Sequence, residues 1–173
     1  MRKWMLVILS VLMAAAIPAA AQDDIYHALQ RNSWYLPTDD AKATIYVTSL
    51  GQGPKVVTLH GGFGANFEYM VRAVERHTAQ RQFVFFDQRG SLLSPYKGKL
   101  EELSVEDLVA DLEKLRKELG EDKMVLLAHS MGTRLAYEYL RRYPDRVSAL
   151  ILIGAFAPTA AASELYGDRK SVV

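Results

Sequence analysis

The stretch MVLLAHSMG at residues 124–132 carries the strongest structural signal in this sequence. An apolar run typical of a buried strand leads directly to Ser130, and residues 131–142 have the pattern of a helix. A serine on a tight turn between a strand and a helix exposes its Oγ at the end of a sheet, which is the arrangement of a nucleophile elbow. We therefore take Ser130 as the candidate nucleophile. A buried serine at the end of a strand, or a serine that only caps the following helix, is the alternative.

Strands and helices alternate on both sides of this stretch. Apolar runs predict strands at 43–50, 55–59, 82–86, 123–128 and 147–153, and apolar spacing predicts helices at 68–80, 104–119 and 131–142. Ser104 and Asp107 predict a capping box at the start of the second helix, and Gly120 predicts its end. In the first helix we expect one side to carry Tyr69, Met70, Ala73, Val74 and His77. Strands that are apolar throughout predict an α/β fold, with a mostly parallel sheet and helices on both faces.

Two loops that follow strands carry further candidate site residues. In HGGFG at 60–64, the glycines let backbone N–H groups point into a pocket, where they stabilise an oxyanion. We expect His60 to fix this loop by hydrogen bonding and not to act as a base. In DQRGSLLS at 87–94, we expect Asp87 and Arg89 to lock the loops beside the site through charge-assisted bonds. A solvated turn is the alternative for this second block.

These three blocks, in this order, resemble the α/β-hydrolase fold superfamily and, within it, the proline iminopeptidase-type branch (peptidase family S33). The hallmarks of that branch are an HGGPG loop, a DQRGxGxS loop and a G-x-S-x-G-G elbow. The resemblance implies that Ser130 is the nucleophile and that the amides of Gly62 and Met131 are the oxyanion donors. It runs from about residue 55 to residue 158, and this chain departs from the pattern at Phe63, Leu92, Ala128 and Thr133.

The residues that complete a catalytic triad are not found after Ser130. In hydrolases of this type an acid and then a histidine follow the serine, yet the last of the four histidines is His129. Asp145, Glu164 and Asp168 follow the serine, and we expect none of them to be the triad acid. We therefore expect residues 22–173 to be the N-terminal part of a single α/β-hydrolase domain, truncated before the cap and the last strands.

The leading hypothesis for function is a serine hydrolase that acts on ester or amide bonds, including N-terminal peptide bonds, through an acyl-enzyme. The alternative is a non-catalytic ligand-binding protein on the same scaffold. A nucleotide-binding α/β protein is disfavoured because neither G-x-G-x-x-G nor a Walker loop is present. We expect a small-molecule or peptide substrate, no cofactor and no metal ion.

The N-terminus and the composition indicate where the protein works. Arg2 and Lys3, an apolar run at 4–17 and the sequence PAAA at 18–21 predict a signal peptide over residues 1–21, hence export to the periplasm or secretion. An uncleaved membrane anchor is the alternative. The absence of cysteine excludes disulfides, thiolate metal sites and a lipid-modified cysteine, so we expect no stable membrane anchor after cleavage. A net charge of +1 gives no indication of a nucleic-acid partner.

Overall fold

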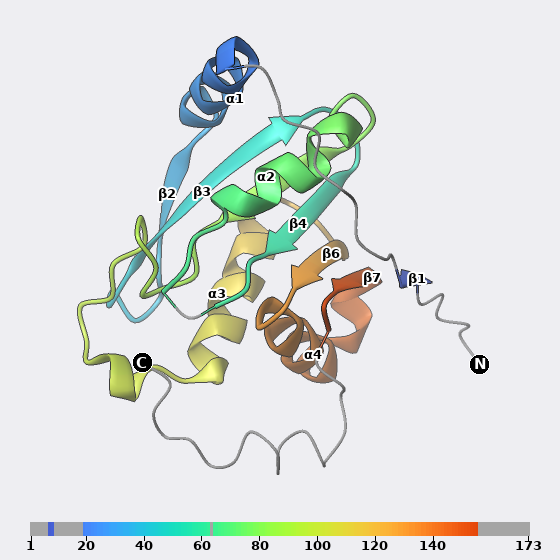
Figure 1. Cartoon of the computed structure of the whole chain (residues 1–173). Helices are drawn as coiled ribbons and strands as arrows, with labels where there is room; N and C mark the ends of the chain where they lie inside the picture. Colours follow the sequence, from blue (N-terminus) through green and yellow to red (C-terminus); the bar gives the residue numbers. More distant parts are fainter. Residues whose placement is uncertain (1–6, 9–18, 63, 156–173) are drawn as a thin grey trace.

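The computed structural model of the chain describes residues 7–8, 19–62 and 64–155 (Figure 1). In chain order the elements are β1 (Val7–Ile8), α1 (Ala19–Arg31), β2 (Trp34–Pro37), β3 (Thr44–Gly51), β4 (Lys55–Leu59), α2 (Glu68–Val74), the 3-10 turn η1 (Glu75–His77), β5 (Gln82–Phe86), the 3-10 turn η2 (Leu100–Glu102), α3 (Val105–Glu118), β6 (Met124–His129), α4 (Gly132–Arg142), the 3-10 turn η3 (Pro144–Arg146) and β7 (Val147–Ile153).

One sheet joins the strands of the described residues, in the order β1-β7-β6-β4-β5-β3-β2. Strand β4 lies in the middle and pairs in parallel with β5 and β6, and β7 pairs in parallel with β6 and β1. Strand β3 instead pairs antiparallel with both β5 and β2. The mostly parallel sheet is confirmed, whereas the antiparallel edge made by β2 and β3 is a feature that the apolar runs do not predict.

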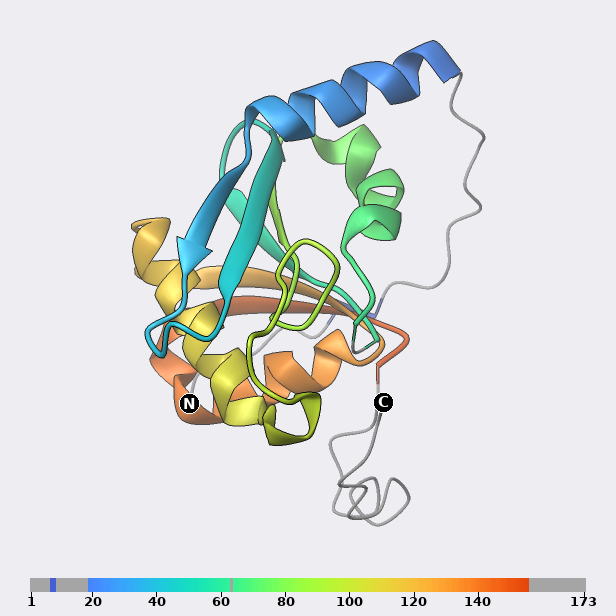
Figure 2. The same ribbon diagram turned by 90° about the vertical axis from the view of Figure 1, so that its left-hand side faces the viewer.

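Helices cover both faces of this sheet, as predicted (Figure 2). Phe83 and Phe85 of β5 pack in one hydrophobic cluster with residues of α1 and α2, while Val84 and Phe86 pack in a second cluster with residues of α3 and α4. Successive residues of a strand point to opposite faces. A strand between two helical layers is therefore apolar at every position, which explains why these runs do not alternate.

The predicted capping box of α3 is present. The Ser104 hydroxyl accepts a hydrogen bond from the Asp107 N–H at 3.2 Å, and the Asp107 carboxylate accepts one from the Ser104 N–H at 3.0 Å. The apolar stripe of the helix is buried at Leu108, Leu112 and Leu115. Helix α3 therefore begins where its own sequence signals place it.

Helix α2 differs from the prediction in length and in its buried side. The α-helix ends at Val74 and tightens into the η1 turn, where the Thr78 hydroxyl donates to the Glu75 carbonyl at 2.8 Å. The chain has to turn here because it enters β5 at Gln82, only a few residues later. The buried side consists of Met70, Val71 and Val74. Met70 and Val74 belong to the expected set, whereas its other members, Tyr69, Ala73 and His77, are exposed.

Three N-terminal elements, β1, α1 and β2, were not predicted. Helix α1 spans residues 19–31 and so crosses the expected cleavage point before Gln22, and β1 lies within the expected signal peptide. The C-terminal part of α1 is attached to the sheet, because the Leu29 side chain is buried and its carbonyl accepts the Thr48 hydroxyl at 2.6 Å. Most of residues 1–21 lie outside the described residues, so the signal peptide stays a prediction. No helix in the described part of the chain is long and apolar enough to cross a membrane.

Candidate active site

Ser130 occupies a sharp bend between β6 and α4. Its φ is +50°, in the left-handed region that residues with a side chain rarely adopt. The Ser130 N–H donates to the Ile153 carbonyl of β7 at 3.0 Å, and the Ser130 carbonyl accepts from the N–H and the hydroxyl of Thr133 at 2.9 and 2.6 Å. Strained backbone persists only where the surrounding structure holds it. Here β7 and α4 both hold it, and the serine is left half-buried.

The glycine loop after β4 lies directly against this bend. A Cβ atom on Gly61 would be 2.8 Å from the Cβ of Ser130, and a Cβ on Gly132 would be 2.2 Å from the carbonyl oxygen of Leu59. Atoms in a packed interior do not approach so closely, so only glycine fits at these two positions. The structure therefore brings the 60–64 block and the 128–132 block into one site, backbone against backbone.

Gly62 and Met131 are the residues expected to supply main-chain donors to an oxyanion. The N–H of Gly61 is bound by the Tyr69 hydroxyl at 2.6 Å, so Gly62 carries the next N–H of the loop. In residues 19–62 and 64–155, no hydrogen bond is found that uses the N–H of Gly62 or of Met131 as its donor. Two N–H groups that no described residue accepts, on the two segments that meet at a serine, are what an oxyanion site requires.

His60 is a buried link between the two loops. Its Nε2 accepts the Gln88 N–H at 3.0 Å, its Nδ1 donates to the Gly61 carbonyl at 3.1 Å, and its carbonyl accepts the Gln88 side-chain amide at 2.8 Å. Burial lowers the pKa of the His60 imidazole below its usual value, with the Gly61 carbonyl and Asp87 acting in the opposite direction. With both nitrogens bound in this way, His60 holds the glycine loop to the loop after β5. Gln88, which sequence reasoning missed, is its partner.

Asp87 ties the start of α2 to the loop after β5. Its carboxylate is fully buried and accepts hydrogen bonds from the Phe67 N–H at 3.1 Å and the Leu93 N–H at 2.9 Å. Backbone donors therefore satisfy this buried charge, as a charge removed from water requires. Asp87 and Arg89, both expected to lock the loops beside the site, do so through separate partners.

Arg89 joins three segments through a buried ion-pair cluster. Its guanidinium forms a bidentate pair with Asp111 of α3, with both N···O distances at 2.6 Å, and a further bond with Asp40 at 2.7 Å. Burial opposes the charge, but the bonds to the two carboxylates raise the pKa of Arg89 above its usual value. Because Arg89 is only 4% exposed, this block is not a solvated turn. The sequence gives no signal for Asp40 and Asp111 as partners, since they lie far from Arg89 along the chain.

Tyr69 and His129 form a second link that sequence reasoning missed. The Tyr69 hydroxyl lies 2.8 Å from Nδ1 of His129, in addition to its bond with the Gly61 N–H. The two rings meet edge to face, with centroids 5.3 Å apart. Burial raises the pKa of the Tyr69 phenol, while the Gly61 bond acts in the opposite direction. The phenol therefore keeps its proton at neutral pH.

A base for Ser130 is not evident in the described part of the chain. His60 uses both ring nitrogens elsewhere, and His129 uses Nδ1 for Tyr69. His27 and His77 are exposed on α1 and η1. Among the acidic residues named above, Asp145 lies in η3, and Glu164 and Asp168 lie outside the described residues.

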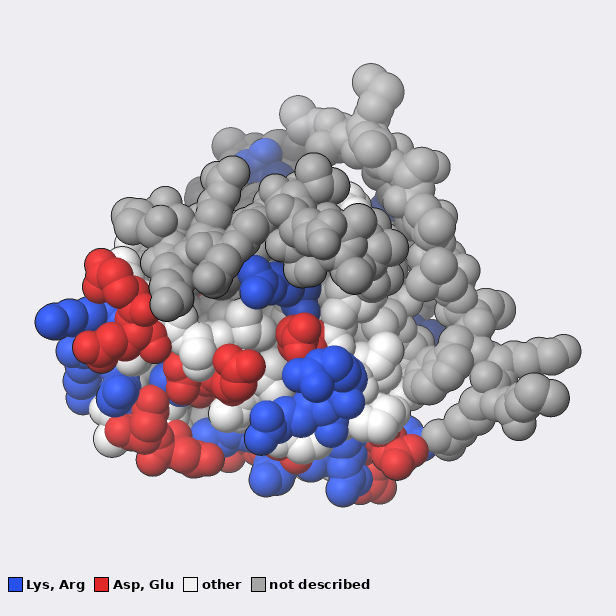
Figure 3. All heavy atoms as spheres, turned by 90° about the horizontal axis from the view of Figure 1, so that it is seen from below, with Lys and Arg blue, Asp and Glu red and all other residues white. Residues whose placement is uncertain are grey.

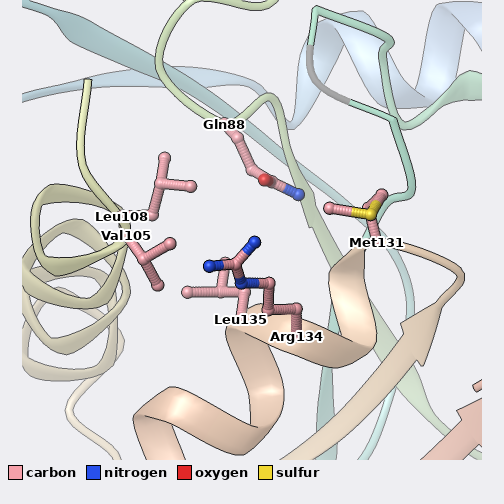
Figure 4. A pocket seen from close by; sticks show the side chains of 6 residues that line it. All are labelled: Gln88, Val105, Leu108, Met131, Arg134 and Leu135. Carbon is pink, nitrogen blue, oxygen red and sulfur yellow. The ribbon is translucent and has the colours of Figure 1, made fainter. Parts of the chain in front are cut away.

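A small hollow lies beside the start of α4 (Figure 4). Gln88 and Arg134 turn their polar ends toward this space, between α3 and the residue that follows Ser130. The remaining lining is apolar and consists of Val105, Leu108, Met131 and Leu135. The hollow therefore adjoins one of the two candidate donor residues, and a guanidinium and an amide face it.

Charged and metal-binding groups indicate no second site among the described residues. On the face that carries α3 and α4, seen from below, acidic and basic side chains are interspersed (Figure 3). Within residues 19–62 and 64–155, no three His, Asp or Glu side chains gather in a way that would hold a metal ion.

The chain is similar in sequence to a known protein family and to several known enzymes. A model of the alpha/beta hydrolase fold family matches residues 54–170. A probable proline iminopeptidase of Leptolyngbya boryana is 38% identical over 115 residues, which are 65% of this chain and 36% of the relative. The proline iminopeptidase of Xylella fastidiosa is 38% identical over 104 residues, 60% of this chain and 33% of the relative. This chain thus spans about a third of the length of these relatives.

Solved structures agree with these matches. The proline iminopeptidase-related protein from Thermus thermophilus has a TM-score of 0.62 and 34% identity, over 69% of this chain and 43% of its own. An epoxide hydrolase from Vigna radiata has a TM-score of 0.67 at 20% identity, over 82% of this chain and 47% of its own, and shares the fold alone. The resemblance drawn from the three sequence blocks is therefore confirmed.

Proposed function

The chain belongs to the alpha/beta hydrolase fold family, and from this premise we propose that it carries the nucleophile and the oxyanion site of a serine hydrolase. The observation that supports this most directly is the positive-φ Ser130, held at a strand–helix bend against the Gly61–Gly62 backbone. A serine so placed is accessible to a carbonyl group, and the N–H groups of Gly62 and Met131 lie on the two segments that border it.

The proposed reaction is acyl transfer. Ser130 Oγ attacks the carbonyl carbon of an ester or amide and loses its proton to a base, and the N–H groups of Gly62 and Met131 stabilise the oxyanion that forms. The C–O or C–N bond then breaks, the leaving alcohol or amine takes up the proton, and water hydrolyses the acyl-enzyme. We propose that the histidine base and its acid partner come from outside the described residues. The chain's share of about a third of its relatives' length is consistent with that.

The proposed substrates are small esters and amides, with N-terminal peptide bonds as the favoured class. The support comes from the relatives described as proline iminopeptidases, which are 38% identical over the matched segment. Competition tests this choice. A short peptide with a free N-terminal proline should slow the reaction of Ser130 with an active-site probe more than its N-acetylated counterpart does. Equal effects of the two peptides would argue against an aminopeptidase-type site.

A serine-reactive fluorophosphonate tests the function itself. On the purified chain we expect slow but selective labelling of Ser130, because an oxyanion site without the rest of a triad still accelerates acyl chemistry by about 10³-fold over water. Ser130→Ala should abolish the label. Ser33→Ala, which removes another partly exposed hydroxyl, should leave labelling unchanged. A label spread evenly over the serines, or none at all, would favour a non-catalytic ligand-binding protein.

We also propose that the protein is exported, with residues 1–21 as a cleaved signal peptide. The support is the basic start, the apolar run and the PAAA sequence before Gln22. The mass of the mature protein recovered from a periplasmic or culture fraction tests this proposal, and an N-terminus at Gln22 is the expected result. A full-length protein that stays in the membrane fraction would instead indicate an uncleaved anchor.

A further inference from the structure

Tyr69 stands where the two halves of the candidate site meet. It lies in the first turn of α2 and is 45% exposed, so it is not a core residue. Its hydroxyl is nevertheless bonded on two sides, to the Gly61 N–H at 2.6 Å and to His129 Nδ1 at 2.8 Å. Gly61 belongs to the glycine loop, and His129 directly precedes Ser130. A single oxygen atom therefore connects the loop after β4 with the end of β6.

We infer that Tyr69 is a positioning residue of the reactive site, whose hydroxyl holds the glycine loop in register with Ser130. This inference rests on the proposed function of Ser130. None of the three sequence blocks includes Tyr69, so the motifs that identify the family say nothing of it.

The hydrogen-bond inventory supports this role. A tyrosine hydroxyl donates one hydrogen bond and also accepts. Here the Gly61 N–H is a donor, so the hydroxyl accepts from it, and the same oxygen shares a second hydrogen bond with His129 Nδ1. Both bonds of the hydroxyl lie within the protein, one to the glycine loop and one to the end of β6, so Tyr69 connects the two segments that carry the proposed donors.

The position of Gly61 explains why a small displacement matters. Gly61 lies so close to the Ser130 side chain that a Cβ atom would not fit between them. Gly62, whose N–H is a proposed donor, is the next residue and has a φ of +73°. If the Tyr69 bond is lost, the Gly61 N–H loses its link to the end of β6. The peptide that carries the Gly62 N–H is then held through the Gly61 carbonyl, which His60 Nδ1 binds.

Tyr69→Phe tests the inference, because it removes only the hydroxyl of a partly exposed side chain. We expect the rate of fluorophosphonate labelling at Ser130 to fall about tenfold, which is less than the roughly 10²-fold loss that a 1 Å misplacement of a reacting group produces. The Gly61 amide should exchange with solvent faster, and the ¹⁵N shift of His129 Nδ1 should move. Tyr26→Phe is the matched control, since Tyr26 is 44% exposed and lies on α1. It should change none of these readouts.

A pair of His129 variants separates positioning from packing. His129→Asn places an amide close to the former Nδ1 and keeps a hydrogen-bond partner for the Tyr69 hydroxyl, so labelling should fall less than in His129→Leu. His129→Leu keeps bulk but removes the hydrogen-bond partner of Tyr69, so labelling should fall as in Tyr69→Phe. In the Tyr69→Phe background, His129→Leu should cause little further loss, because both changes break one link.

The outcomes distinguish the inference from the proposed function. If wild type and Tyr69→Phe label Ser130 at the same rate, Tyr69 does not position the site, although Ser130 is reactive. If wild type does not label at all, the proposed function fails and the inference fails with it. Slower labelling of Tyr69→Phe together with faster Gly61 exchange supports both.

Discussion

In Gly132→Ala, helix propensity and tertiary packing at the start of α4 act in opposite directions on stability. Gly132 is the first residue of this helix and is buried. By helix propensity alone, alanine in place of glycine is favourable by about 1 kcal/mol. The tertiary structure predicts the opposite, because the new Cβ would lie 2.2 Å from the Leu59 carbonyl oxygen and 2.7 Å from that of His60.

The size of the effect follows from these distances. Carbon–oxygen contacts normally begin at about 3.3 Å, so the helix and the end of β4 would have to separate by roughly 1 Å. Both neighbours are backbone atoms, in the last residue of the central strand β4 and in the residue that follows it, and they cannot move aside as a flexible side chain does. Overpacking of this kind costs about 3 kcal/mol, and the gain in propensity offsets about 1 kcal/mol of that. We expect a net loss of about 2 kcal/mol or more in the free energy of unfolding.

Urea unfolding measures this loss as a lower midpoint at an unchanged slope. Gly120→Ala is the control, because Gly120 has a φ of +68° but no atom within 4 Å of its added Cβ. It should lose about 1 kcal/mol from backbone strain alone. Gly132→Ala should also slow the labelling of Ser130, since Ser130 and Met131 move with the start of α4. If Gly132→Ala is as stable as wild type or more stable, the close approach of α4 to β4 is refuted.

Three further predictions concern the loops around the site and helix α3. Burial lowers the pKa of His60 from 6.5, so below that pH the unfolded chain binds a proton that the folded chain rejects. The free energy of unfolding should therefore fall as the pH falls from 6.5 toward the lowered folded pKa, and less steeply in His60→Gln; parallel curves would contradict this. Asp111→Ala leaves Arg89 buried without its bidentate partner and should cost about 3 kcal/mol in urea unfolding, against at most about 1 kcal/mol for the exposed Asp39→Ala; equal losses would refute a buried pair. Ser104→Ala removes the capping box of α3 and should lower the unfolding free energy by about 1 kcal/mol, and no change would show that the cap is redundant.

Much of the fold was predictable because its signals are local. A capping residue, a glycine after the last turn and an apolar run act on neighbours in the chain, so α3 and strands β4 to β7 lie where their own residues place them. Helix α2 shows the limit of such signals. Its spacing was compatible with more than one buried side, and contact with the sheet selected Met70, Val71 and Val74 over Tyr69.

The candidate site also has a part that its local sequence predicted and a part that it did not. Ser130, the glycine loop and the loop after β5 were recognisable because each is a compact block that follows a strand, and parallel strands end at the same edge of a sheet. Their cross-links were not recognisable. Arg89 pairs with Asp40 and Asp111, and Tyr69 reaches His129, across 49, 22 and 60 residues of chain.

The sequence by itself determined the α/β class, the order of the central elements and the identity of the serine at the bend, since these depend on residues adjacent in the chain. Only the tertiary structure decided which glycines are obligatory, which side of α2 is buried and which polar side chains hold the loops together. Those features depend on distances of a few ångströms between segments far apart in sequence. Hydrogen bonds and steric contacts act over that range, and a one-dimensional pattern does not record it.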